Sequence, residues 1–162
     1  MHTVLRSTGF KLLCCVVLVF STSLVYSQVS AQKLHASSAV TTLNSGNKWE
    51  TDDAVRKGME NIHQAMTTSQ QGIAKEQLSA QDYQQLADTI DKNLAAIVNT
   101  RHVSKEAETA FHLVVMMDLT QSTALMRSAL KVQLQRAGAF GVQQSLRNYG
   151  QHFQHPGWTS GT

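Results

Sequence analysis

The absence of proline from the whole middle of the chain, where apolar residues recur every three or four positions, constrains the fold most. The only proline is Pro156, close to the C-terminus. Proline removes a backbone donor and clashes with the preceding helical turn, so a long stretch without it is typical of helices. No strand-like alternation interrupts this stretch. The sequence therefore predicts an all-α domain.

Four segments of the chain have the helical period. We predict helices over residues 51–73, 79–101, 104–136 and 140–153. The third would be unusually long, with a kink around Thr120–Thr123 and an end at Gly138. Short connections favour antiparallel neighbours. The predicted fold class is an all-α, antiparallel up-down helical bundle of four helices, with a long third and a short fourth helix.

Polar residues that cap helices mark the starts of three of these segments. Thr51 is the expected N-cap of the first helix, and Ser104 is that of the third. Ser79 followed by Asp82 has the spacing of a capping box. The residues predicted to face the core are Val55, Met59, Ile62, Met66 and Ile73; Tyr83, Leu86, Ala87, Ile90, Leu94, Ile97 and Val98; Phe111, Val114, Val115, Leu119, Leu125, Met126, Ala129, Leu130 and Val132; and Val142, Leu146, Tyr149 and Phe153.

The first 31 residues have the plan of a secretory signal peptide. Arg6 and Lys11 precede an apolar run over residues 12–26, and small residues follow at Ser30-Ala31. The run is shorter than the roughly 20 residues that a spanning helix needs. We predict export to the periplasm, cleavage after Ala31 with Ser27 as the alternative, and no stable membrane span after cleavage. A flexible leader over 32–47, the bundle over 48–158 and a tail over 159–162 would follow.

Removal of the signal peptide changes the chemistry of the chain. Both cysteines, Cys14 and Cys15, leave with it, so the mature domain has no thiol for a disulfide, a nucleophile or a metal. Arg6 and Lys11 leave too, so 12 of the 14 basic residues remain against 11 acidic ones. A nearly neutral domain of this kind is not expected to bind nucleic acid.

Recognised catalytic motifs are missing from the sequence. It contains no H-E-x-x-H, G-x-S-x-G, P-loop or G-x-G-x-x-G pattern, and no C-x-x-C-H for covalent haem. We therefore predict a protein that is not an enzyme.

Methionine and histidine side chains form a candidate soft-metal site. On a helical wheel His112 and Asp118 fall on the apolar arc of the third helix, and Met116 follows His112 by four residues. Met59 lies on the core stripe of the first helix, with His63 at its edge. Thioether and imidazole together suit copper(I). The candidate metal ligands are Met59, His63, His112, Met116 and Asp118.

Structural roles for these residues stay open. His112 and Asp118 would then cap or hydrogen-bond a neighbouring helix, and the methionines would fill gaps in the core. His152 and His155 have the spacing of a two-histidine metal clamp, or they are surface and capping residues. Trp158 is expected to cover an open end of the bundle.

Charge is uneven along the chain. No acidic residue follows Asp118, whereas Arg127, Lys131, Arg136 and Arg147 do. The basic residues either form solvated helix faces or contact a protein partner in the cell envelope.

Two resemblances add to this interpretation. The stretches WETDDAVRKGM, from Trp49 to Met59, and YGQHFQHPGW, from Tyr149 to Trp158, resemble a family of small exported proteobacterial helical proteins of unknown function. Residues Gly58 to Ile62, together with His152, are similar to the soluble b-type cytochrome four-helix bundles. That second resemblance implies haem b held between Met59 and His152.

Three functional hypotheses follow. The first is an exported, non-enzymatic bundle that binds a soft metal such as copper through Met and His. The second is a haem-binding electron carrier. The third is a purely structural or partner-binding protein of the envelope.

Overall fold

The structure, a computed structural model, describes residue 44 and residues 46–159. The predicted signal peptide and most of the predicted leader lie outside these residues, so both stay predictions. The described part forms α2 (Asp53–Ala74), α3 (Ala80–Thr100), α4 (Lys105–Phe111), the π-helical turn η1 (His112–Met116), α5 (Met117–Ser128) and α6 (Val132–His152).

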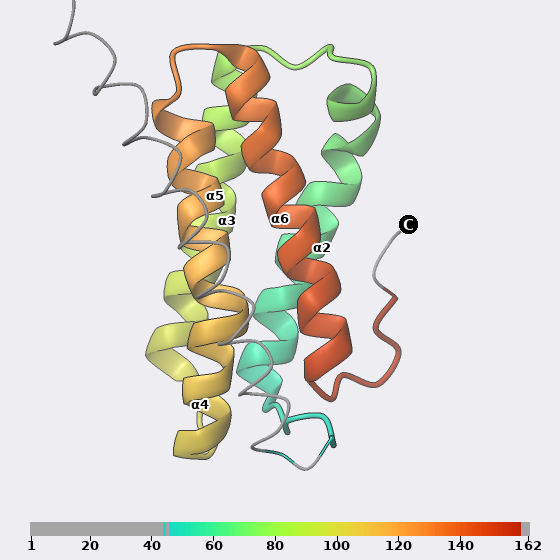
Figure 1. Cartoon of the computed structure of the whole chain (residues 1–162), viewed down its shortest axis with the longest axis vertical. Coiled ribbons are helices and arrows are strands. Elements are labelled where there is room, and N and C mark those ends of the chain that lie inside the picture. Colours follow the sequence, from blue (N-terminus) through green and yellow to red (C-terminus); the bar gives the residue numbers. More distant parts are fainter. Residues whose placement is uncertain (1–43, 45, 160–162) are drawn as a thin grey trace, which may run out of the picture. The chain divides into compact units, whose positions relative to one another are not determined.

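These elements make four rods, because α4, η1 and α5 follow one another without a break. The rods run alternately up and down in Figure 1, with the α5–α6 turn at the top and the start of α4 at the bottom. Helix α5 packs against α3 and α6, and α2 packs against the same two helices. The predicted all-α antiparallel bundle of four helices is therefore confirmed.

Helix starts follow the predicted capping rules with one exception. Ser79 and Ser104 cap α3 and α4, and Ser79 and Asp82 form the expected capping box. The first helix is capped by Asp52 and not by Thr51, since the Asp52 carboxylate accepts a hydrogen bond from the backbone N–H of Val55 at 2.8 Å. The same carboxylate accepts a bond from the backbone N–H of His102. Asp52 thus joins the start of α2 to the connection between α3 and α4.

The lengths predicted for the third and fourth helices are wrong. The third rod ends at Ser128, and α6 begins at Val132 and runs for 21 residues. Gly138 does not end a helix but lies inside α6. A Cβ on Gly138 would lie 2.7 Å from the backbone oxygen of Ser122. Glycine at this position therefore allows α5 and α6 to approach each other closely.

The irregularity of the third rod lies at the π-helical turn and not at Thr120–Thr123, where α5 is continuous. Core residues of this rod are spaced by four, at Phe111, Val115 and Leu119. In an α-helix with 3.6 residues per turn this spacing drifts around the axis, and a π-helical turn takes up the extra residue. Leu119 is fully buried, as predicted, whereas Asp118, which the helical wheel placed near the middle of the apolar arc, is only half-buried.

The core otherwise follows the predicted stripes. Every predicted core residue of α2 and α6 is buried, as is Phe153, and in α3 only Val98 is exposed. Leu125, Leu130 and Val132 were also expected in the core, yet they are exposed. Leu125 lies on an outer face of α5, and the third rod ends before Leu130 and Val132. Among the described residues no helix combines the length and apolar character needed to cross a membrane.

Candidate functional site

The C-terminal tail is tied to the segment that precedes α2. Trp49 and Phe153 form a parallel β-bridge, in which the N–H of Trp49 donates to the oxygen of His152 at 2.8 Å. The N–H of Gln154 donates back to the oxygen of Trp49 at 2.7 Å. These bonds fix the path of the tail along the bundle.

An aromatic cluster fills the bundle at this end. The rings of Tyr149 and Phe153 stack at 5.5 Å, and Phe111 meets both edge-on. Trp158 closes the cluster, with its ring centroid 4.8 Å from that of Tyr149. A Cβ on Gly150 would lie 2.6 Å from Nε1 of Trp158, so the indole needs glycine there. The expectation that Trp158 covers an end of the bundle agrees with this packing.

Tyr149, His155 and Glu60 form a chain of hydrogen bonds beneath the tail. The Tyr149 hydroxyl lies 2.9 Å from Nδ1 of His155, and Nε2 of His155 lies 3.2 Å from a carboxylate oxygen of Glu60. Burial raises the pKa of Tyr149 well above its usual value, so the hydroxyl keeps its proton, which Nδ1 accepts when the imidazole carries its own proton on Nε2. The imidazole then donates from Nε2 to Glu60. The side chain of His155 is only 3 % exposed.

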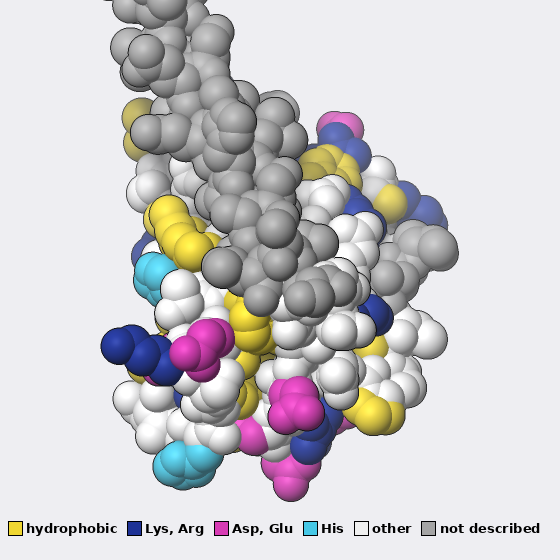
Figure 2. Space-filling model, turned by 60° about the horizontal axis from the view of Figure 1, so that its bottom comes forward, with side chains coloured by type: hydrophobic (Ala, Val, Ile, Leu, Met, Phe, Trp, Pro, Cys, Tyr) yellow, Lys and Arg dark blue, Asp and Glu magenta, His cyan; other side chains and the backbone are white. Residues whose placement is uncertain are grey.

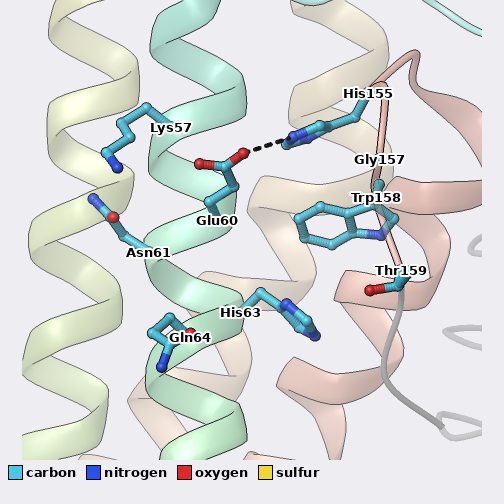
Figure 3. A pocket seen from close by; sticks show the side chains of 9 residues that line it. All are labelled: Lys57, Glu60, Asn61, His63, Gln64, His155, Gly157, Trp158 and Thr159. Carbon is cyan, nitrogen blue, oxygen red and sulfur yellow. Dashed lines mark hydrogen bonds and ion pairs between the residues drawn. The ribbon is translucent and has the colours of Figure 1, made fainter.

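A pocket of about 340 Å³ lies between α2 and the tail, and we call it the tail pocket (Figure 3). Its lining residues are Lys57, Glu60, Asn61, His63, Gln64, His155, Gly157, Trp158 and Thr159. In Figure 3 the Trp158 ring lies between the rings of His155 and His63. Its centroid is 5.0 Å from that of His155 and 5.2 Å from that of His63.

The predicted two-histidine clamp does not form. His152 ends α6, whereas His155 lies beyond the helix with both ring nitrogens engaged by Tyr149 and Glu60. Trp158 also stands between His155 and His63. Among residues 44 and 46–159, no three His, Cys, Asp or Glu side chains are grouped so that they could hold a metal ion.

The predicted soft-metal ligands fall into three places. Met59 is fully buried in the core, and His63 lies beside Trp158 in the tail pocket. His112, Met116 and Asp118 lie on the third rod, on or next to η1. The prediction that His112 faces the core is wrong, since its side chain is exposed. Asp118 is half-buried and not central to the core, because the π-helical turn shifts the helix by one residue.

The π-helical turn brings Met116 and Met117 into the same turn as the exposed His112. The backbone N–H of Met117 bonds the oxygen of His112, so residues 112 and 117 are neighbours across the turn. Met116 is half-buried beside them, and Met117 is 53 % exposed. In a regular α-helix the neighbours of His112 one turn on would be Val115 and Met116. We call His112, Met116 and Met117 the η1 donor group.

Met59 and His152, the pair implied for haem, lie at the end of the bundle that the aromatic cluster occupies. Met59 is fully buried, and burial together with the nearby Lys48 ammonium lowers the pKa of His152. A neutral imidazole suits a metal ligand, and the rings of Tyr149 and Phe153 stack on each other at the same end of the bundle.

Two basic residues of the C-terminal half pair with acids on α3 and on the connection between α2 and α3. Arg127 bonds Asp88 at 2.7 Å and Asp91 at 2.8 Å, and both contacts raise its pKa. Arg136 bonds Glu76 at 2.5 Å. On the face shown in Figure 2, acidic and basic side chains are interspersed. Arg127 and Arg136 are therefore paired with acids of the N-terminal half, whereas Arg147 bonds the neutral Gln144 of its own helix.

Several residues of these sites were missed by the sequence analysis. Glu60 was not predicted as a site residue, although its Glu-x-x-His spacing to the predicted ligand His63 puts both on one face of a helix. Met117 was not a predicted metal ligand, because the prediction assumed a regular α-helix without a π-helical turn. The partnership of His155 with Tyr149 depends on the path of the tail, which no local pattern predicts.

The fold and these sites define an all-α, four-helix bundle with a polar pocket at one edge and a surface donor group on its third rod. No family model matches the chain, and no curated protein or solved structure was found to be similar to it.

Proposed function

We propose that this protein is an exported, non-enzymatic helical bundle that binds copper(I) through the η1 donor group. The observation that carries the proposal is the π-helical turn, whose backbone bond from Met117 to His112 brings His112, Met116 and Met117 into one turn, with His112 and Met117 exposed. One nitrogen and two sulfur donors form a soft set, and thioethers favour copper(I) over harder cations.

Export and the loss of both cysteines support the same function. The predicted mature domain holds no thiolate, so binding would depend on methionine and histidine alone. Such ligands are not consumed by disulfide formation in an oxidising compartment. A copper-binding role therefore suits the compartment that the predicted signal peptide implies.

The engagement of His155, the histidine best placed for acid–base chemistry, also favours a binding role over a catalytic one. His155 is buried, and its two ring nitrogens are engaged by Tyr149 and Glu60. A general base must reach the proton that it removes from a substrate. His155 instead holds the tail in place.

Anaerobic competition titration against a chromogenic copper(I) chelator tests the proposal. We expect the wild-type protein to take up one copper(I) ion, and His112→Ala and Met117→Leu each to weaken binding by about tenfold or more, which is about 1.4 kcal/mol. Met126→Leu is the matched control, because Met126 is fully buried elsewhere in α5. Uptake by His112→Ala as tight as that of the wild type would refute the site, and no uptake by the wild type would refute the function.

A further inference from the structure

We propose that the tail pocket binds a neutral sugar ring, stacked on the indole of Trp158. This proposal does not depend on copper binding, since none of the pocket residues belongs to the η1 donor group. The indole is fixed in place, polar groups of both kinds surround it, and a second hollow adjoins it.

The indole is held in place before any ligand arrives. Its Nε1 edge faces Gly150, and the edge-to-face contact with Tyr149 packs it onto α6. In Figure 3 the ring presents its broad face to the viewer at the opening of the tail pocket. A rigid aromatic side chain loses little conformational entropy on binding, which favours a ligand with a flat apolar face.

The polar groups around the indole match hydroxyl groups. Lys57 supplies donors, and Glu60 supplies acceptors, of which one oxygen is used by His155. The amides of Asn61 and Gln64 both donate and accept. Because the charges of Lys57 and Glu60 offset each other, the pocket favours a neutral ligand whose groups also both donate and accept. A sugar ring combines such hydroxyls with an apolar C–H face.

A second hollow, of about 540 Å³, continues the tail pocket towards the start of α2. It shares Lys57, Glu60 and His155 with the tail pocket and adds Asp53, Arg56 and Pro156. From Asp53 to Gln64 the two hollows follow α2 for roughly 16 Å at 1.5 Å per residue. This length favours a short oligosaccharide over a single sugar.

The pocket is arranged to bind a sugar and not to cleave it. Glycoside hydrolysis needs a pair of carboxyl groups on either side of the bond. Glu60 is bonded to His155, and Asp53 is bonded to Arg56 at 2.5 Å. We therefore expect the sugar to leave unchanged.

Tryptophan fluorescence tests the proposal directly. The chain has two tryptophans, so Trp49→Phe leaves Trp158 as the only emitter. Titration of this variant with maltotriose and with chitotriose is expected to give a saturable change in emission for at least one, with a Kd on the order of 1 mM. Saturation-transfer NMR on the wild-type protein checks the same sugars without any substitution.

Variants of the pocket rim locate the binding. Lys57→Ala and Gln64→Ala are expected to weaken binding several-fold, whereas Lys92→Ala and Gln71→Ala, exposed residues outside the pocket, leave it unchanged. The proposal is overturned if neither sugar gives a saturable signal by either method with protein that is folded by circular dichroism. It is also overturned if the rim variants bind as well as the controls. Neither outcome bears on copper uptake at η1.

Discussion

At the scale of single residues, two buried tyrosines differ in what their hydroxyls contact. Tyr149 donates to His155, and its ring lies in the aromatic cluster. The hydroxyl of Tyr83 is also buried, but it has no hydrogen-bond partner among the described residues. Removing a hydroxyl costs stability mainly when a buried partner is left unsatisfied.

The two tyrosines therefore make a matched pair of substitutions. Tyr149→Phe is expected to lower the free energy of unfolding by about 1–3 kcal/mol, because Nδ1 of His155 loses its donor. Tyr83→Phe is expected to be neutral or slightly stabilising. Urea denaturation of both variants measures the difference. Equal losses would contradict the hydrogen-bond chain from Tyr149 to Glu60.

His152 gives the protein a dependence on pH at its C-terminal end. Burial, with a contribution from Lys48, holds the pKa of His152 below the ordinary 6.5. A group whose folded pKa is depressed stabilises the fold above its unfolded pKa, and this stability is lost as the pH falls through the folded pKa. We expect the wild type to lose stability below about pH 6.5, and His152→Gln to lose less of it.

Denaturation midpoints measured from about pH 7 down to about pH 5 check this expectation. The two proteins differ only at residue 152, so the difference between the two profiles is the relevant quantity. Parallel profiles would show that His152 is not responsible.

At the scale of elements, the existence of the four helices was predictable, whereas the register of the third was not. The stripes of α2, α3 and α6 follow from period and capping alone, and Ser79 with Asp82 marked a boundary correctly. The third rod departed from its predicted register because its core residues are spaced by four, which requires a π-helical turn. A helical wheel drawn at a constant angle per residue cannot represent such a turn. Gly138 was misread for a related reason, since only the neighbouring helix shows that a close approach requires it.

The π-helical turn leads to a prediction about deletions in the third rod. Deleting Leu113, which is 39 % exposed in η1, is expected to convert the turn to α-helix and to leave Leu119 and Met126 in the core with little loss of stability. Deleting Gln121, an exposed residue in the regular part of α5, displaces Leu119 or Met126 from the core. That displacement is expected to cost at least about 3 kcal/mol.

Urea denaturation distinguishes the two deletion variants, because both remove one exposed residue from the same rod. If deletion of Leu113 were as damaging as deletion of Gln121, the extra residue would not reside in η1.

At the scale of the whole molecule, the packing of distant segments decides which residues lie together, and local sequence patterns do not show this. The methionine and histidine content pointed to five candidate ligands, of which the fold keeps His112 and Met116 on one turn and puts Met59 and His63 elsewhere. Contacts between distant segments, such as Tyr149 with His155 or Arg136 with Glu76, depend on how the rods and tail pack. The tail pocket exists only because the tail returns along α2, so no local pattern predicted it.

The central claim is that an exported, thiol-free bundle holds one copper ion at η1. Native mass spectrometry of the protein recovered from the periplasm of copper-supplemented bacterial cells tests it most directly. We predict a chain that begins at Gln32 and carries one copper ion, and a metal-free chain for His112→Ala. A wild-type chain without copper, or one that carries the mass of haem, would contradict the account.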